Sequence, residues 1–164
     1  MRTMQKSLML LCLGPTLANA GERIEKIHVS GNVSVEFTNA DRGDYEIISP
    51  GPDTPVESRL ENGHLVVKHE GKTSQKNVIL KISGEGVKKI RASGAGMINF
   101  NSNNIRNTDL SFQGYYTINN LDDHEAMNFN GSGNFVFCQV SFNPKKMKIA
   151  GKLSYAETDK CKKS

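Results

Sequence analysis

The sequence predicts an all-β domain built as a parallel β-solenoid, with three or four stacked coils preceded by a short antiparallel β meander. Apolar and polar residues alternate with a period of two through most of the chain after residue 20, whereas helical periodicity is almost absent. An alternating unit with a central glycine also occurs five times, and its last four copies return every 17 to 20 residues. Such repeats are typical of solenoids, in which each unit buries its apolar face by stacking on its neighbours.

Residues 1–20 are predicted to be a secretory signal peptide. They begin with two basic residues, continue with the apolar run Ser7–Leu13, and end on small residues before the junction between Ala20 and Gly21. Signal peptidase recognises this three-part order, and the apolar run is too short to span a bilayer. The alternative is a buried N-terminal helix. We expect cleavage between Ala20 and Gly21 and export of the mature chain to the periplasm or the extracellular space.

The repeated unit places mostly apolar residues at even offsets from its central glycine and mostly polar residues between them. Such a strand has one buried face and one solvent-facing face, and the glycine permits a bend between its halves. We place the central glycines of the five copies at Gly31, Gly94, Gly114, Gly131 and Gly151. The register predicts a set of buried residues and a set of exposed ones. They are Ile98, Phe112, Phe129 and Phe135 (buried) and Lys89, Arg91 and Asn99 (exposed).

Short linkers between the later copies predict a third side to each coil. They carry apolar residues of their own at Ile105, Leu121, Val140 and Phe142. Of the 15 Asn that follow residue 20, 11 fall within residues 99–143, and Asn tolerates the left-handed backbone that tight corners need. An antiparallel β-sandwich is the alternative, because its strands also alternate and return at regular intervals. The long period favours stacked coils.

Residues 38–83 have a different pattern. Short strands separated by turn residues are predicted at 45–49, 56–60, 65–68 and 78–82. Asn62-Gly63 is a strong hairpin signal, and three nearby prolines mark a loop. We expect an antiparallel meander that covers the open edge of the first coil. Residues 21–83 would then hold the first strand motif and the meander, and residues 84–157 the remaining coils.

Length, charge and cysteine usage narrow the classes of protein and partner. The 164 residues fit one domain with its own core, and no apolar stretch is long enough for a transmembrane helix. Residues 144–164 hold seven Lys against two acidic residues. The basic tail, 158–164, is a candidate for peripheral contact with phosphate-bearing lipid or an acidic polymer, and a solvated tail is the simpler interpretation. After cleavage Cys138 and Cys161 remain, and an oxidising compartment favours a disulfide between them over two free thiols.

Several of these motifs resemble the head GIN domain family. They are Ile27–Val33, Asn62–Leu65, Ile90–Gly96 and Asn130–Gly133, and they occur in the order of the family. Each Ser-Gly-x-Gly is weak alone, whereas the ordered series over about residues 24–157 is fairly specific. The resemblance implies an exported, right-handed β-helix-like domain in a bacterial envelope protein of proposed adhesin type, with no established activity. The copies around Gly114 and Gly151 lack the second glycine, so we expect different corners there.

The sequence contains no catalytic or metal-binding constellation, and we expect neither enzymatic activity nor a cofactor. The His residues, at positions 28, 64, 69 and 124, lack the spacing of a metal motif. His64 and His69 would face opposite sides of a continuous strand. The densest acidic cluster is Asp122, Asp123 and Glu125. A solvated loop is its simpler interpretation, and a cation site or a sugar-cleaving site is the alternative.

Tyr115-Tyr116 is the most suggestive pair of candidate ligand contacts. Alternation sends one ring into the core and leaves the other outside, where it can stack on a sugar or a protein partner. An exposed Tyr that serves no ligand is the simpler interpretation.

We expect an exported, non-catalytic binding or adhesion module that presents a regular polar face to a polysaccharide or to an envelope or host protein. A rigid repeating surface suits a repetitive ligand. The alternatives are an enzyme acting on polysaccharide and a structural envelope component. Nucleic acid is not an expected partner, because the basic stretch lacks interleaved aromatic residues. The oligomeric state is not defined by the sequence.

Overall fold

The computed structural model describes residues 23–41, 43–51, 54–71, 77–101, 105, 107–121, 128–139 and 147–155. The prediction of an all-β chain is confirmed, because strands make up 71% of these residues and none of them lies in a helix. No helix that could cross a membrane occurs in this part of the chain. The strands are β1 (Lys26–Thr38), β2 (Tyr45–Ile48), β3 (Val56–Glu61), β4 (His64–His69), β5 (Val78–Ser83), β6 (Lys89–Asn99), β7 (Asp109–Asn119), β8 (Asn128–Cys138) and β9 (Met147–Tyr155).

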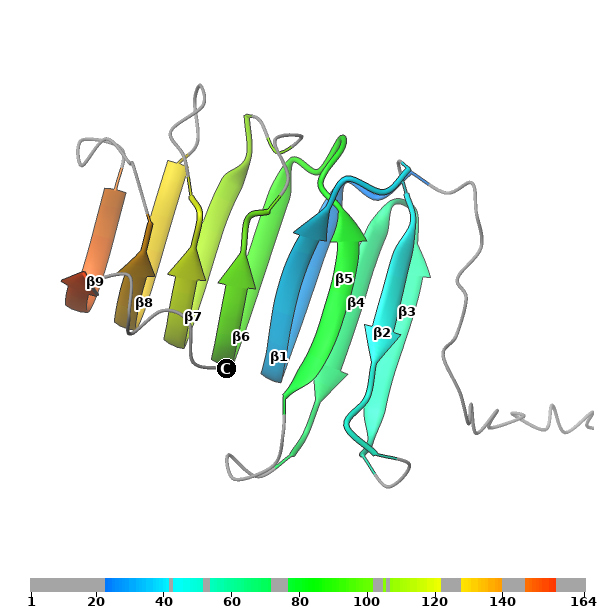
Figure 1. Cartoon of the computed structure of the whole chain (residues 1–164), viewed down its shortest axis with the longest axis horizontal. Helices are drawn as coiled ribbons and strands as arrows, with labels where there is room; N and C mark the ends of the chain where they lie inside the picture. Colours follow the sequence, from blue (N-terminus) through cyan, green and yellow to red (C-terminus); the bar gives the residue numbers. More distant parts are fainter. Residues whose placement is uncertain are drawn as a thin grey trace, which may run out of the picture.

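All nine strands belong to one sheet, which is mostly parallel. Strand β1 pairs with β6, and β6, β7, β8 and β9 then follow side by side in chain order, each parallel to the one before (Figure 1). The described strands do not close this sheet on itself. This half of the molecule thus consists of parallel strands that are neighbours both in the chain and in the sheet, as expected for stacked repeats.

One column of glycines runs across the parallel strands. It is formed by Gly31, Gly94, Gly114, Gly133 and Gly151, which are register partners from each strand to the next. All five have positive φ, between 84° and 138°. We call this set the glycine column, and we call the parts of each strand before and after it the first arm and the second arm.

The glycine column corrects the fourth repeat. We expected Gly131 as its central glycine, whereas Gly133 pairs with Gly114 and Gly131 pairs with Phe112. Both glycines lie at even offsets, so a shift by two residues leaves the buried and solvent-facing sides unchanged. Burial alternation therefore could not distinguish the two registers.

The core lies between the two arms of each strand. Phe129, in a first arm, makes edge-to-face contacts with Phe135 and Phe137 in the second arm of the same strand, at centroid distances of 5.7 and 5.5 Å. It makes another with Phe112 of the neighbouring strand, at 5.3 Å. Gly131 makes room for these rings, because a Cβ there would lie 2.7 Å from Phe135 and 2.8 Å from Phe129. Aromatic packing thus joins the two arms.

The ladder of backbone hydrogen bonds continues beyond the ends of the strands. Asp109 N donates to Lys88 O at 2.9 Å, and Asn120 N donates to Cys138 O at 3.1 Å. Ile105 and Leu121, two of the predicted linker residues, are buried. Val140 and Phe142 lie outside the described residues. The left-handed backbone predicted for Asn is found at Asn107 and Asn120 in this region, and at Asn62 in the hairpin.

Strands β2–β5 occupy the predicted positions, but their pairing is not that of a meander. Only β3 and β4 form an antiparallel hairpin of consecutive strands. Strand β4 instead lies parallel to the first half of β1 and β5 lies parallel to its second half, while β2 is antiparallel to β5. The predicted meander is wrong. Strands β4 and β5 each pair with one half of β1, so their apolar faces continue the apolar face of β1, whereas a sheet paired in chain order would leave that strand uncovered. Together they cover the edge of β1, as expected.

The burial predictions are largely correct. Ile98, Phe112, Phe129 and Phe135 are all at most 2% exposed, and Arg91 is exposed. Lys89 and Asn99 are half-buried instead of exposed. Lys89 is flanked in register by Lys26 and Asp109, and Asn99 accepts a hydrogen bond from Asn120 Nδ2 at 3.1 Å. Neighbouring strands therefore shield solvent-facing positions that the sequence treats as free.

Candidate functional site

The outer side of the first arms carries a group of basic residues from three adjacent strands. They occupy solvent-facing positions in β4, β1 and β6, opposite the buried positions of the same strands. We call them the cationic face. Its members are His64 and Lys68 of β4, Lys26 and His28 of β1, and Lys89 and Arg91 of β6.

Parallel register places several of these basic residues at adjacent positions of neighbouring strands. Lys26 is the register partner of both His64 and Lys89, and His28 is the partner of Arg91. Neighbouring strands lie about 4.8 Å apart, so the like charges of Lys26 and Lys89 stand side by side. Like charges directly opposite each other oppose pairing, so this face stores repulsion that an anion would relieve.

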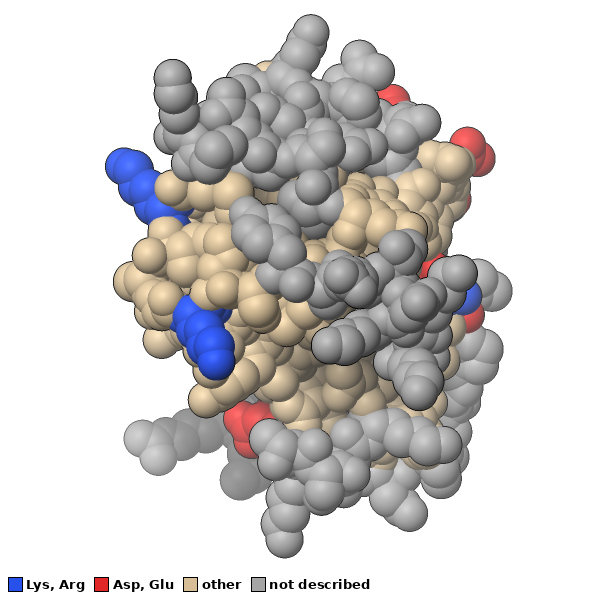
Figure 2. Space-filling view, turned by 60° about the vertical axis from the view of Figure 1, so that its left-hand side comes forward, with Lys and Arg blue, Asp and Glu red and all other residues tan. Residues whose placement is uncertain are grey.

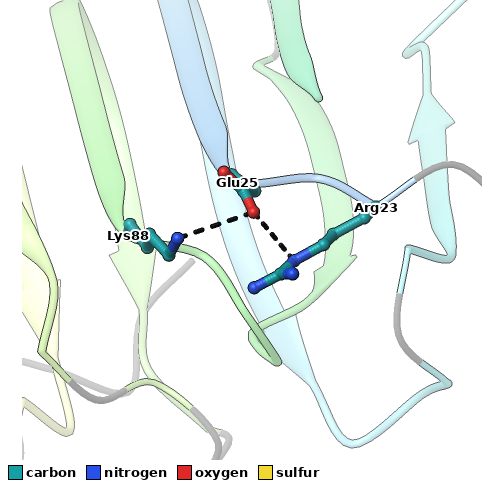
Figure 3. Close-up of polar contacts among 3 residues, drawn as sticks. All are labelled: Arg23, Glu25 and Lys88. Atoms are coloured by element: carbon teal, nitrogen blue, oxygen red, sulfur yellow. Dashed lines mark ion pairs between the residues drawn. The ribbon is translucent and has the colours of Figure 1, made fainter. Parts of the chain in front are cut away.

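No described ion pair includes a residue of the cationic face. The carboxylate nearest to it in sequence, Glu25, is occupied, because its Oε1 lies 2.9 Å from Arg23 Nε and 3.6 Å from Lys88 Nζ (Figure 3). The remaining described ion pair joins Arg59 to Glu61 on β3. Within the described part of the chain, the charges of the face are thus not neutralised by a bound carboxylate.

Acidic residues border the cationic face on both sides. On β3, Glu57 and Glu61 are the register partners of Lys68 and His64. On β7, Asp109 is the partner of Lys89 and accepts a hydrogen bond from Asn128 Nδ2 at 3.0 Å. The basic residues of β4, β1 and β6 are therefore flanked by carboxylates on β3 and β7.

Beyond Asp109 the same outer side is hollowed and polar. An open hollow of about 380 Å³ extends from Lys89 and Arg91 to Lys148 of β9, and Asp109, Ser111 and Asn130 line it between them. A second hollow lies between Lys26, His64 and Arg91. Cations, hydroxyls, amides and the carboxylate of Asp109 thus line one side of the stack.

His28 lies within this field. Partial burial lowers the pKa of its imidazole below the ordinary value of 6.5, and the nearby His64, Arg91 and Lys68 lower it further. Its register partner on β6 is Arg91, and on β4 His64 and Lys68 stand on either side of its partner Val66. The protonation of His28 is therefore coupled to the charge of the face.

The predicted division of the tyrosine pair is observed. Tyr115 is 66% exposed, whereas Tyr116 is 2% exposed and packs against Phe112 at a centroid distance of 5.7 Å. Burial raises the pKa of the Tyr116 hydroxyl. Tyr115 follows Gly114 of the glycine column and lies in register between Ala95 and Asn134. Only Tyr115 is therefore placed where a ligand could stack on it.

The β9 end of the molecule differs from the cationic face. Figure 2 turns this end toward the viewer, and uncharged residues make up most of the coloured surface, with a few separated cationic and anionic groups. Strand β9 places its half-buried Met147, Ile149 and Leu153 at even offsets from Gly151. The concentration of positive charge is thus a feature of the strands near β1.

Several predicted site residues lie outside the described residues. They are the signal cleavage pair Ala20 and Gly21, the acidic cluster Asp122, Asp123 and Glu125, and Cys161. Cys138 is described and is 1% exposed. Its disulfide with Cys161 stays a prediction. In the described ranges, no three or more His, Cys, Asp or Glu residues are grouped so as to hold a metal ion.

Sequence reasoning missed the cationic face. The tail drew attention because it holds most of the excess Lys, whereas residues 21–143 carry a net negative charge. The available signal was positional, since Lys26, His28, Lys89 and Arg91 occupy equivalent solvent-facing positions of two repeats. What joins His64 and Lys68 to them is the parallel pairing of β4 with β1, which the sequence did not predict.

The chain matches no protein-family model, and the search of curated proteins finds no significant match. The class of protein is therefore defined by its architecture alone, as an all-β chain with a mostly parallel sheet.

Proposed function

We propose that this protein is a non-catalytic binding module whose stacked strands present a rigid polar face to a polysaccharide. The supporting observation is the alignment of β6–β9 on the glycine column, which repeats outward positions at a constant spacing. Strand spacings of about 4.8 Å set the repeat, and a rigid array of this kind suits a ligand that is itself repetitive. The protein partner that the sequence also allows is the competing outcome.

The proposal includes a finer description of the fold as a right-handed β-solenoid of the head GIN type. Its support is the continuation of the backbone ladder into the connections, as between Asn128 N and Thr108 O at 3.4 Å. The buried Val87 O also accepts a hydrogen bond from Thr108 Oγ1 at 2.8 Å, which ties two successive connections together. Stacked coils require that their connections also stack, whereas independent crossovers do not.

Export to the cell envelope is part of the same proposal. It rests on the signal-like N-terminus and on the resemblance of the ordered Gly-containing motifs, both of which are properties of the sequence. Secretion of a tagged full chain, followed by determination of the mature N-terminus, tests it. An N-terminus at Gly21 supports export, and retention of an uncleaved chain in the cytoplasm contradicts it.

The function is tested by retention of the full chain on a panel of immobilised neutral and charged polysaccharides. New chain ends are measured in the same samples. Retention without new chain ends supports the binding module. Cleavage would replace it with an enzyme, and absence of retention on every polysaccharide would contradict it.

Tyr115 provides the matched variants for this test. Removal of its exposed ring by Tyr115→Ala should weaken retention about fivefold to tenfold, as expected for one lost stacking contact of about 1 kcal/mol. Ser58→Ala removes an exposed polar group from β3, away from β6–β9, and should leave retention unchanged. Equal retention by both variants would remove Tyr115 from the binding surface.

A further inference from the structure

We infer that the cationic face is the docking surface for an acidic polysaccharide, laid across the strands from β4 toward β9. The inference rests on the proposed function and specifies the ligand class and the surface that holds the anionic groups of the polymer. A contact with Tyr115, on the second arm of β7, belongs to the proposed function alone. It assigns the anionic groups of the polymer to β4, β1 and β6. It assigns the hydroxyl groups to Ser111, Asn128 and Asn130 of β7 and β8.

The first argument is charge complementarity. Lys26, Lys68, Lys89 and Arg91 are fixed on three adjacent strands, and none of them has an ion-pair partner among the described residues. A bound carboxylate or sulfate between β1 and β6 would lie near Lys26, Lys89 and Arg91 together, because these residues line one hollow. Arg presents a planar fork of donors that matches such groups. Their mutual repulsion is relieved by an anion and by no neutral ligand.

The second argument is the direction and length of the polar path. From β4 to β9 the outer side crosses five strand spacings, or about 24 Å, which exceeds the size of a single sugar or a free phosphate. Arg91 at one end and Lys148 at the other line the same hollow. A linear polymer that crosses the strands can reach both.

The third argument distinguishes a polysaccharide from other polyanions. Ser111, Asn128 and Asn130 line the hollow between Arg91 and Lys148, and hydroxyl and amide groups pair readily with sugar hydroxyls. Asp109 also lines this hollow, where its carboxylate accepts a hydrogen bond from Asn128, so we assign neutral groups of the polymer to this part of the path. Single-stranded nucleic acid is bound largely by base stacking on aromatic side chains, and the only exposed large hydrophobic residue described is Tyr115, on the second arm. A membrane surface usually adds an apolar contact to its charge, whereas the one apolar residue described at a solvent-facing position of this face, Val66, is half-buried.

The test measures affinity of the full chain for two polyanions and their neutral counterparts. Polygalacturonate is paired with its methyl ester, and dextran sulfate with dextran, so the two arms separate carboxylate from sulfate recognition. We expect binding to at least one polyanion, at least tenfold weaker binding to its neutral counterpart, and a loss of affinity as salt is raised from 50 to about 500 mM.

The decisive variant is Lys89→Gln with Arg91→Gln, which removes two positive charges from the centre of the face. It should weaken polyanion binding at least tenfold. The control is Lys81→Gln with Lys152→Gln, which removes the same charge from β5 and from the second arm of β9 and should change affinity less than twofold. Equal thermal midpoints of both variants show that folding is preserved.

Three results would overturn the inference. They are equal affinity for the charged and neutral polymers, equal loss of affinity in the two double variants, and tighter binding of single-stranded DNA or of phosphatidylglycerol vesicles than of either polyanion. Retention on neutral polysaccharides that is unaffected by Lys89→Gln with Arg91→Gln would reject this surface and leave the proposed function standing. Absence of retention on every polymer would reject both.

Discussion

The parallel strands β6–β9 and the region β2–β5 extend the sheet on the two sides of β1, and they do so in different ways. Each of β6–β9 is one continuous strand that passes through the glycine column. On the other side of β1, the place of one such strand is taken by β4 and β5, which pair with the two halves of β1. His69 stands where the other strands have glycine. That place is thus filled by two separate strands (Figure 1).

The comparison explains what the glycines are for. A Cβ on Gly94, Gly114, Gly133 or Gly151 would overlap the carbonyl oxygen of the preceding member of the column, and a Cβ on Gly31 would overlap that of His69. His69 has no preceding parallel strand at this position, since its other neighbour is Val56 of the antiparallel β3. It therefore keeps a side chain, which is 1% exposed and whose Nδ1 lies 3.0 Å from Pro55 O. In the glycine column, a side chain is therefore excluded by the backbone of the preceding strand as well as disfavoured by the positive φ.

The largest expected effect comes from placing a side chain in the glycine column. Gly114→Ala should lower the free energy of unfolding by more than about 3 kcal/mol, because Cβ would overlap Gly94 O at a φ of 120°. Gly51→Ala is the control, since the nearest atom would be Thr54 Oγ1 at 4.0 Å, and it should stay within about 0.5 kcal/mol. Urea denaturation measures both. Similar values for the two variants would show that the column is not required.

The second effect compares the cores of the two regions. Phe129→Ala should cost about 3–5 kcal/mol, because this fully buried ring holds both arms of β8 together and touches β7. Leu60→Ala removes a half-buried side chain of β3 and should cost about 1 kcal/mol. A larger cost for Leu60→Ala would place the main stability in β2–β5 instead of in the parallel strands.

The smallest effect is a pH dependence at the boundary between the regions. The lowered pKa of His28 in the folded chain means that the unfolded chain binds its proton first as pH falls below 6.5. Folding stability should therefore decrease as pH falls through this range and level off below the folded pKa. The neighbours that face His28 are His64 and Lys68 of β4 and Arg91 of β6, with Lys26 and Ser30 on its own strand.

Thermal denaturation of the chain and of His28→Gln between pH 8 and pH 5 measures this dependence. The variant should lose part of the decrease, because it lacks the imidazole whose pKa is lowered in the folded chain. The affinity for a polyanion should depend on pH in the opposite direction. A bound polyanion stabilises the protonated imidazole, so affinity should rise as pH falls. An identical pH profile for His28→Gln and the unaltered chain would separate His28 from both effects.

The sequence determined the local properties of this protein. Alternation assigned Ile98, Phe112, Phe129 and Phe135 to the buried side, and Asn62-Gly63 predicted the β3–β4 hairpin; both are consequences of side-chain period and turn preference, which act within a few residues. Tyr115 and Tyr116 were divided between surface and core for the same reason.

Only the tertiary structure decided which strands are neighbours and in which register. Alternation is unchanged by a shift of two residues, so Gly133 could be distinguished from Gly131 only by its partner Gly114. Alternation also says nothing of direction, so the parallel pairing of β4 and β5 with β1 was not foreseen. The cationic face depends on that pairing, because a charged surface is made by residues that are close in space, and strand pairing alone brings His64 and Lys68 to Lys26.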